Sequence, residues 1–455
     1  MKIVIIGAGS VAFTPAILSG FSTDKRYRNS TIGLIDVDKE MLELVRKFAD
    51  RISREFHQNW KIEASTDRRD ILGDADFVTT SIGVGGVKAW QQDLDIPYKH
   101  GVIQPVGDTS GPGGLARALR HIPLHVEIAK DMEDLCPTAT LFNFTNPLTA
   151  ITQAVNRLTK IRCVGLCIGP DITWSHLCRI IGVDKAQTTA IIGGINHCHW
   201  VMDLRIQGQD AFPLLHAALD EMQGDSGRAD KFRKEFGGLV KRPHEPSADQ
   251  PLCTRLFHML NAYPGPGDGH VAEFFPQLMT PLIGNVEHYQ GEAIKYVNES
   301  YPKLREKMIA TGTHDAPIDT EDFAKELAWE HTQFLDILAS QQGNLGQVFH
   351  VNVPNKGYIH NLPDEAVVEV PATVDKAGIH PLALGDLPLP IVPVMAHKLA
   401  SIDLIIEAAI EGSREKAIQA ILNDPHCTDI DKGALLVNEL IEAQLEYLPR
   451  FRGAA

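Results

Sequence analysis

Residues 2–12 read KIVIIGAGSVA, an apolar run of strand length that leads into a glycine turn and then into a helical pattern. Gly7 permits the tight turn, and Gly9 lets backbone N–H groups approach a pyrophosphate at the positive end of the following helix. Ala12 takes the third position of the dinucleotide fingerprint, where alanine is a permitted variant. The residues of this turn predicted to contact the cofactor are Gly7, Gly9, Ser10 and Val11.

An acidic residue, Asp36, stands at the end of the next predicted strand. A carboxylate there would accept hydrogen bonds from the adenine-ribose hydroxyls and repel a 2′-phosphate, which favours NAD over NADP. Asp36 comes later than the usual spacing of about 20 residues, because the stretch TDKRYRNS at 23–30 lengthens the connection. A second glycine cluster, GVGG at 83–86, follows the fourth predicted strand and adds Gly83 to the cofactor contacts. The alternative reading of the fingerprint is an ordinary strand–helix turn.

Short apolar runs alternate with helix-length amphipathic stretches through the first 170 residues, which is typical of βαβ units and a parallel sheet. Runs such as DFVTTSIG are almost continuously apolar, as expected for strands covered by helices on both faces. We therefore expect an α/β fold with a doubly wound parallel sheet of the Rossmann type. The predicted strands are 2–6, 31–36, 62–66, 76–82, 140–144 and 162–167.

The pattern changes after about residue 200. Two stretches, 284–310 and 320–341, have helical periodicity, whereas 355–375 predicts short strands around a Gly/Pro-punctuated turn. At 455 residues the chain exceeds the size at which a single core keeps growing. We expect an NAD-binding Rossmann domain at 1–200 and an α+β lobe at 201–455 for substrate binding, catalysis and oligomerisation.

The composition excludes several classes of protein. The chain has 43 Lys and Arg against 58 Asp and Glu, a net charge of −15 that repels nucleic acid and anionic membrane surfaces. No apolar run reaches the roughly 18 residues of a membrane span, and the amino terminus lacks a small-residue cleavage site. Seven cysteines without a dense framework fit a reducing compartment, in which a thiolate can bind a metal. We expect a cytoplasmic globular protein with neither nucleic acid nor membrane as a partner.

Two residues are candidates for sharing one divalent ion. Cys167 ends the sixth predicted strand, and His197 lies in GGINHCHW, each where the chain turns toward the carboxyl edge of the sheet. A thiolate and an imidazole can bind the same ion, and two ligands leave positions open for substrate oxygens and water. His199 would point to the opposite face of an extended segment, so it is the weaker candidate. The alternative for each residue is an ordinary place in the core.

Three polar residues stand in or beside predicted turns. Asp108 precedes a helix in GDTSGPGG, Asn146 follows the fifth strand, and Asp268 lies in PGPGDGH. An Asn in that place could touch both the nicotinamide ribose and the substrate. Each residue could instead cap a helix or close a turn, which are common uses of Asp and Asn.

In their order along the chain, these motifs resemble the NAD- and metal-dependent glycoside hydrolases of family 4. The resemblance covers nearly the whole chain and implies a fold similar to the lactate and malate dehydrogenases, with an added carboxyl-terminal lobe, assembled as a homodimer or homotetramer. The stretches that carry it are KIVIIGAGS, DADFVTTSIGVGG, DTSGPGGLARALRHIP, NFTNPLTA, GLC, GINH, GDGHVAEFF and NKGYIHNLPDEAVVEVPATVDKAGIHP.

The resemblance also implies a role for each candidate. Cys167 and His197 would bind Mn²⁺, Asn146 would contact substrate and cofactor, Asp108 would be the acid that assists departure of the aglycone, and Asp268 the base that removes the proton from C2. Asp108 and His197 would also touch the substrate. NAD⁺ would take hydride from C3 of the sugar, the ketone would acidify the C2 hydrogen, and elimination, addition of water at C1 and return of the hydride would follow. The substrate would be an α-glycoside.

Two departures from the family pattern fall around the expected substrate site. Cys167 is followed by Ile168, where many members have His or Asn, and Gly269 stands where relatives often have Arg. Both fit a pocket changed for a sugar with an anionic C6 substituent, which makes the related NAD-dependent sulfoquinovosidases an alternative. A plain NAD-dependent sugar or hydroxy-acid dehydrogenase, which would accumulate NADH, is a further alternative. A non-catalytic sugar or nucleotide sensor is disfavoured because the site residues stand at their motif positions.

Overall fold

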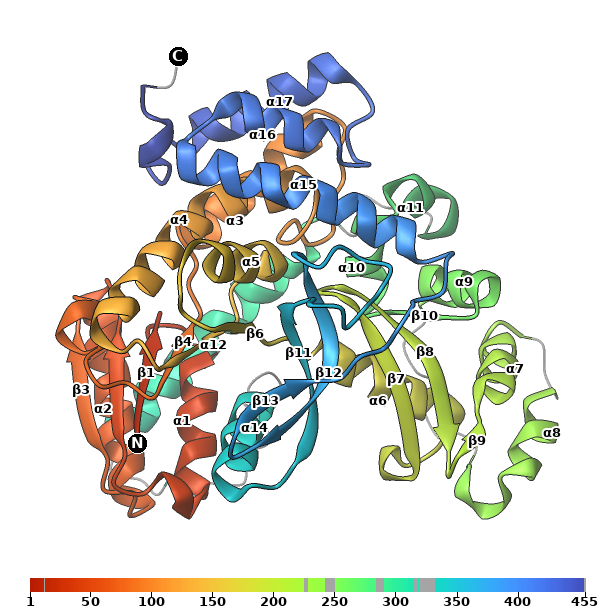
Figure 1. The fold of residues 1–455 in the computed structure, drawn as a ribbon, viewed down its shortest axis with the longest axis horizontal. Coiled ribbons are helices and arrows are strands. Elements are labelled where there is room, and N and C mark those ends of the chain that lie inside the picture. The colour runs from red at the N-terminus through yellow and green to blue at the C-terminus, as the bar shows by residue number, and fades with distance from the viewer. Residues whose placement is uncertain are drawn as a thin grey trace.

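The computed structural model describes residues 1–11, 13–224, 228–241, 250–283, 290–313, 318 and 332–453. One large mixed sheet runs through the molecule, flanked by helices, and α15 to α17 gather at one end (Figure 1). The strands are β1 Lys2–Ile6, β2 Thr31–Ile35, β3 Lys61–Ser65, β4 Phe77–Thr80, β5 Thr140–Asn143, β6 Cys163–Gly165, β7 Thr188–Ile195, β8 Cys198–Ile206, β9 Gln209–Asp210, β10 Tyr263–Gly265, β11 Gln347–Pro354, β12 Val367–Asp375 and β13 Gly378–Pro381.

Helices connect most of these strands. None of the helices in the described residues is long and apolar enough to cross a membrane. The helices are α1 Phe13–Thr23, α2 Lys39–Glu55, α3 Gly86–Lys99, α4 Gly111–Leu135, α5 Leu148–Leu158, α6 Gly169–Ile181, α7 Phe212–Met222, α8 Arg228–Glu235, α9 Pro251–Leu260, α10 Asp268–Val271, α11 Pro276–Ile283, α12 Glu292–Thr313, α14 Thr332–Gly343, α15 Val392–Glu411, α16 Arg414–Leu422 and α17 Ile430–Ala443.

The amino-terminal half of the sheet is parallel and has the order β3-β2-β1-β4-β5-β6. All six strands expected from the sequence are present, and the apolar residues of β1 are buried after Lys2. The strand order reverses between β1 and β4, and a crevice for a ligand forms at the carboxyl ends of strands at such a switch point. The predicted Rossmann-type fold is therefore confirmed.

The sheet continues into the carboxyl-terminal half through antiparallel pairs. β11 pairs with β6, and β12 lies between β11 and β7, so strands far apart in the sequence share one sheet. Of the strands expected at 355–375 only β12 forms, because residues 355–366 make the loop that enters it, and β11 begins earlier, at Gln347. The expected helices are represented by α12 and α14, although residues 284–289 and 320–331 of those stretches lie outside the described residues.

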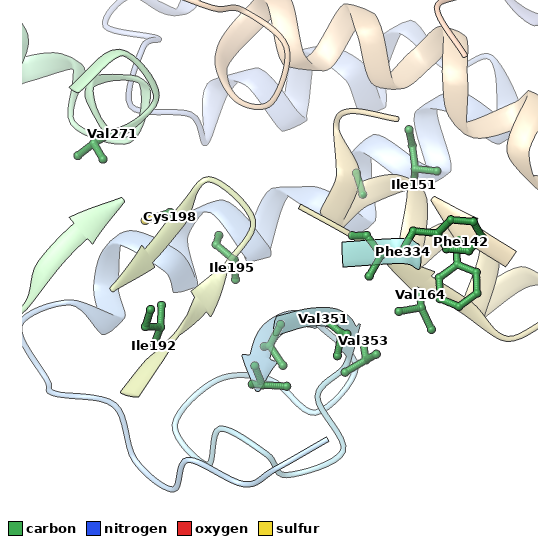
Figure 2. Packing of buried hydrophobic residues seen from close by; sticks show 14 of the residues in the cluster. Phe142, Ile151, Val164, Ile192, Ile195, Cys198, Val271, Phe334, Val351 and Val353 are labelled. Atoms are coloured by element: carbon green, nitrogen blue, oxygen red, sulfur yellow. The ribbon is translucent and has the colours of Figure 1, made fainter. Parts of the chain in front are cut away.

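The predicted domain boundary at residue 200 falls within β8, the second strand of the β7–β8 hairpin. The division into two domains stays a prediction. The hydrophobic core extends through both halves (Figure 2). Phe142 of β5 packs against Phe334 of α14 with ring centroids 5.1 Å apart, and Val351 and Val353 of β11 belong to the same cluster. A core shared in this way fixes the second half against the edge of the parallel sheet.

Candidate active site

The glycine turn after β1 and the acidic end of β2 come together as the fingerprint requires. Gly7 has φ +86°, and a Cβ there would lie 2.4 Å from the carbonyl oxygen of Ser81, so the position needs glycine. The N–H of Gly9 donates to Oδ2 of Asp36 at 2.7 Å, which places this carboxylate against the turn. Ala12, the third fingerprint position, lies outside the described residues. The predicted adenine-ribose acid thus lies where a dinucleotide would cross the turn.

The second glycine cluster is hydrogen-bonded to α4 through the backbone N–H and the carbonyl oxygen of Val84. Its N–H donates to Nε2 of His121 at 3.1 Å, and its carbonyl oxygen accepts from Nε of Arg120 at 3.2 Å. The neighbouring Gly83 is exposed, and a Cβ there would meet no atom within 4 Å. This side of the predicted cofactor site is therefore open, with its backbone fixed by α4.

Asn146 and Cys167 share one edge of the sheet. Asn143, the last residue of β5, pairs in register with Gly165, the last residue of β6. Asn146 and Cys167 follow these paired residues, so both stand at the carboxyl edge, in the half of the sheet beyond the switch point. Both residues therefore lie at the edge where the sequence places them.

Asp108 is the centre of a hydrogen-bonded cluster at this edge. Its Oδ2 accepts from Nδ2 of Asn146 at 2.8 Å, and its Oδ1 accepts from the hydroxyl of Thr109 at 2.7 Å. Nδ1 of His197 lies 2.9 Å from the same hydroxyl and 3.9 Å from Oδ1 of Asp108. Burial raises the pKa of Asp108, but the positive charges of His197, when that ring is protonated, and of Arg117, together with the Thr109 hydrogen bond, bring it below the ordinary value. Asp108, Asn146 and His197, which come from three separate predicted motifs, therefore lie in one cluster.

The hydrogen bonds also fix the tautomer of His197. The single hydroxyl proton of Thr109 goes to Asp108, so Nδ1 of His197 must carry a proton and donate to Thr109. Burial and the nearby His270 lower the pKa of His197 to about 3, so the ring is neutral at pH 7. The lone pair of Nε2 is then available, as metal ligation through this atom requires.

Cys167 and His199 border a common space. A Cβ on Gly169 would lie 3.3 Å from Sγ of Cys167 and 2.9 Å from Cε1 of His199. His199 is held on both sides, since Nε2 lies 2.9 Å from Oγ1 of Thr173 and Nδ1 lies 3.0 Å from Oε2 of Glu369. With Nε2 at the Thr173 hydroxyl and Nδ1 beside the Glu369 carboxylate, His199 remains a weaker metal candidate than His197.

The chemistry of Cys167 and His197 fits a catalytic ion with open positions. Cys167 is half-buried, and its sulfur accepts the N–H of Gly169 at 3.3 Å. Within the described ranges, no group of three or more His, Cys, Asp and Glu residues is placed to hold a metal ion. An ion bound by this pair would therefore take its remaining ligands from substrate and water.

Asp268 is the first residue of α10, and its side chain caps the amino-terminal end of α9. Its Oδ2 accepts from the N–H of Leu252 at 3.0 Å and its Oδ1 from the N–H of Cys253 at 2.9 Å, the arrangement expected of an N-terminal cap. His270 is the member of the same motif that reaches the cluster, with its ring 4.3 Å from the ring of His197.

Three contributors were not identified from the sequence. Thr109 relays the hydrogen bonds between Asp108 and His197, and His270 contacts His197. Glu273 is buried, and its Oε1 accepts the N–H groups of Val106 at 2.8 Å and Gly107 at 2.6 Å, which holds the loop that presents Asp108. The signal for His270 was its place in the GDGH motif, whereas Thr109 and Glu273 have no pattern that separates them from turn and helix residues.

Glu273 leads to a prediction about stability. Burial raises its pKa to about 8, against an ordinary 4.5. The folded protein therefore keeps this proton up to about pH 8, while the unfolded chain loses it above pH 4.5, so the stability that Glu273 contributes is full at low pH and is lost as the pH rises. Glu273→Gln should become more stable relative to wild type between pH 5 and 8, by on the order of 1 kcal/mol per pH unit. Urea denaturation at several pH values checks this, and a constant difference would contradict it.

Comparison with known proteins matches almost the whole chain to one family. Residues 2–183 match the family 4 glycosyl hydrolases, and residues 192–427 match the C-terminal domain of the same family. The chain is 28% identical over 459 residues to an alpha-galactosidase of Bacillus subtilis (strain 168), which covers 99% of this chain and 100% of that protein. It is 27% identical over 458 residues to an alpha-galacturonidase of the same organism, which covers 98% of each.

Solved structures agree with the sequence comparison about the fold. A 6-phospho-alpha-glucosidase from gut microorganisms, solved in complex with NAD and Mn²⁺, has a TM-score of 0.80 at 20% identity and covers 98% of this chain and 99% of that chain. The two family matches contain the residues of the cluster, from Gly7 in the first glycine turn to Glu273. The resemblance seen in the motifs is confirmed. The chain belongs to the family 4 glycosyl hydrolases.

Proposed function

We propose that this glycoside hydrolase cleaves α-glycosides by transient oxidation at C3, with bound NAD and a divalent metal, most simply Mn²⁺. The observation that carries the proposal is the cluster of Asp108, Asn146, Thr109 and His197 at the carboxyl edge of a sheet whose first turn fits a dinucleotide. A hydrolase that used only paired carboxylates would need no such turn. The NAD and Mn²⁺ bound by the 6-phospho-alpha-glucosidase with the same fold support the proposal.

The residues present fit both groups. When bound, NAD would exchange hydride with C3 of the sugar, and the metal would act as a Lewis acid on the sugar oxygens. Cys167 and His197 would hold the metal. The residues that would hold NAD are Gly7, Gly9, Ser10, Val11, Asp36, Gly83 and Asn146.

Different side chains would carry out the two proton transfers of the reaction, to the leaving oxygen and from C2. Asp108 would protonate the leaving glycosidic oxygen, and Asn146 and Thr109, which donate hydrogen bonds to its two oxygens, would aim it. Because the pKa of Asp108 is lowered, the carboxyl group must take up a proton within the substrate complex before it can act as the acid. The proton at C2 would pass to a base in the 268–270 segment. Asp268 is the base that the resemblance implies, and His270 is the base that the contact with His197 favours.

Several finer properties belong to the same proposal. The relatives include an alpha-galactosidase, which is named for a neutral sugar, and an alpha-galacturonidase, which is named for an acidic one. We propose an acidic glycone, with a sulfoquinovoside as one candidate, because the departures at Ile168 and Gly269 fall at the substrate site. We further propose a cytoplasmic homodimer or homotetramer, with residues 1–200 binding NAD and residues 201–455 completing the substrate site.

A screen of glycosides tests the proposed function. The enzyme, with NAD⁺ and Mn²⁺, is mixed with aryl glucosides, galactosides, galacturonides, glucuronides, 6-phospho-glucosides and sulfoquinovosides, each as both anomers. Release of aglycone without lasting absorbance from NADH is expected. Stoichiometric NADH with intact glycoside would instead identify a dehydrogenase. A sample without NAD⁺ is the control, and full activity in that sample would contradict the redox step.

Asp36 provides a prediction for the cofactor. Asp36→Ala should weaken NAD⁺ binding about tenfold and improve the relative use of NADP⁺, because the variant loses the hydrogen bonds to the ribose and the repulsion of a 2′-phosphate. Titration of intrinsic fluorescence with each dinucleotide measures the effect. Asp38→Ala, at the neighbouring cap of α2, is the matched control. Equal NAD⁺ affinity in wild type and Asp36→Ala would show that the fingerprint is misassigned.

A further inference from the structure

The two residues proposed to hold the metal lie on separate elements of the fold. Cys167 stands two residues before α6, and the N–H of Gly169, the first residue of that helix, donates to its Sγ at 3.3 Å. His197 lies in the turn that joins β7 to β8. Two side chains can share one ion only if their relative position is fixed. The contacts between α6 and the β7–β8 hairpin near this pair therefore bear on metal binding.

A hydrogen bond between Thr173 and His199 joins these two elements. Thr173 lies one turn into α6, and its Oγ1 is 2.9 Å from Nε2 of His199, the second residue of β8. The hydroxyl of Thr173 donates its single proton to the carbonyl oxygen of Gly169 at 2.9 Å, so Nε2 of His199 must carry a proton and donate to Thr173. A chain of hydrogen bonds thus runs from β8 through Thr173 and Gly169 to the sulfur of Cys167.

The ring of His199 is also restricted from its other side. Its Nδ1 lies 3.0 Å from Oε2 of Glu369 in β12, and Oε1 of Glu369 accepts from Nδ2 of Asn352 in β11 at 2.7 Å. His199 and Glu369 are 0% exposed, and Thr173 is 2% exposed. A polar side chain buried this deeply is costly to leave unpaired, so the ring is confined to the orientation that serves both partners.

Gly265 of β10 packs against the same hydrogen bond. It pairs with His199 in the β8–β10 register, and a Cβ there would collide with both Oγ1 of Thr173 and Nε2 of His199. The position therefore needs glycine if the bond is to form. The chain after Gly265 leads into α10, which carries Asp268 and His270, so the segment with the candidate bases begins at this bond.

We propose that His199 is a positioning residue, whose hydrogen bond to Thr173 sets the separation of the two metal ligands and thereby the affinity for the ion. This inference rests on the proposed function, which places the metal on Cys167 and His197. The competing interpretation is that His199 is itself a metal ligand. A ligand needs a free lone pair, whereas the two ring nitrogens of His199 already face Thr173 and Glu369.

The experiment measures Mn²⁺ binding to the enzyme loaded with NAD⁺, from the electron paramagnetic resonance signal of the free ion. Thr173→Val removes the hydroxyl but keeps the shape of the side chain, and Thr173→Ser keeps the hydroxyl. Thr188→Val is the matched control. Thr188 is also buried and accepts a hydrogen bond from Trp174 of α6, but it begins β7, at the opposite end of that strand from His197. Melting temperature and Kd for NAD⁺ are measured for every variant.

Thr173→Val is expected to raise Kd for Mn²⁺ about tenfold or more while Kd for NAD⁺ is unchanged, because groups that orient metal ligands contribute on this scale. Thr173→Ser and Thr188→Val are expected to bind Mn²⁺ within about twofold of wild type, even where the melting temperature falls. Glu369→Asp keeps the charge but withdraws it from His199, and it is expected to raise Kd for Mn²⁺ about fivefold. This variant keeps the test valid if Thr173→Val does not fold.

Other outcomes would overturn the inference or its premise. An unchanged Kd for Mn²⁺ in Thr173→Val and Glu369→Asp would show that the hydrogen bond does not set the affinity. A lower Kd in Thr173→Val would identify His199 as a ligand for which the hydroxyl competes. An equal rise in Thr188→Val would show only a general loosening of α6 against the hairpin. Wild-type enzyme that binds no Mn²⁺, or binds it no better than Cys167→Ser does, would instead overturn the metal site of the proposed function.

Discussion

Cys167→Ser and His197→Ala are each expected to lower kcat by about 1000-fold or more, while Kd for NAD⁺ stays within about threefold of wild type. The expectation follows from where the two residues lie. Both lie outside the β1 turn and Asp36, which are the residues proposed to hold the nucleotide. Loss of a ligand would remove the ion that stabilises charge on the sugar oxygens, but it would leave the dinucleotide contacts in place.

Steady-state kinetics with added Mn²⁺ and fluorescence titration with NAD⁺ measure the two effects separately. Cys427→Ser is the matched control, because Cys427 is also half-buried but lies on the loop before α17. Full activity after exhaustive chelation, or parallel loss of NAD⁺ binding in Cys167→Ser, would contradict the assignment of this pair to a catalytic metal.

His270→Gln is expected to lower kcat by about 100-fold or more with little change in stability. The ring of His270 lies against that of His197, and burial lowers its pKa, so it is a neutral imidazole able to accept a proton at pH 7. Glutamine keeps much of the volume but cannot act as this base. Exchange of the C2 proton with solvent should slow in step with turnover.

Asp268→Asn separates the two candidate bases. An amide group cannot accept both N–H groups that Asp268 now accepts at the start of α9, so this variant should lose about 1 kcal/mol of unfolding free energy. If His270 is the base, residual turnover of Asp268→Asn will still exchange the C2 proton. Loss of that exchange in Asp268→Asn, together with its retention in His270→Gln, would assign the base to Asp268.

The parallel half of the fold was predictable because its signals are local. The strand, the turn and the helix of the fingerprint are consecutive, and Gly7 is required by a close approach within the same unit. Buried strands without alternation also distinguish a parallel sheet from an antiparallel one. The positions of Asn146 and Cys167 followed, because residues after parallel strands meet at one edge.

The strand pairing of the carboxyl-terminal half could not be predicted, because it depends on contacts between residues far apart in the sequence. β11 and β12 find their partners in β6 and β7, more than a hundred residues earlier in the chain, and no local pattern encodes that pairing. Alternation along an extended segment would point His197 and His199 to opposite faces. His197 instead has φ +62° in the turn between β7 and β8, so its direction is set by the turn.

The individual roles of polar side chains were the least accessible to sequence reasoning. Asp268 and Asp108 stand in similar glycine-rich motifs, yet one caps α9 and the other lies in the cluster with His197. Likewise, Arg117 and Arg120 stand in one short motif, and only the structure shows that Arg120 has Asp93 as its partner. Such differences arise from tertiary packing, which a motif does not record.

Deuterium at C2 of the sugar released in D₂O tests the redox-assisted mechanism most directly. A glycosidase that oxidises C3 and then eliminates the aglycone must break both the C3–H bond and the C2–H bond. A glycosidase that uses paired carboxylates breaks neither of these two bonds. Wild-type enzyme, turning over with NAD⁺ and Mn²⁺, is expected to release sugar that carries solvent deuterium at C2 while no NADH accumulates. Product with an unlabelled C2, together with no isotope effect from deuterium placed in the substrate at C2 or C3, would contradict it.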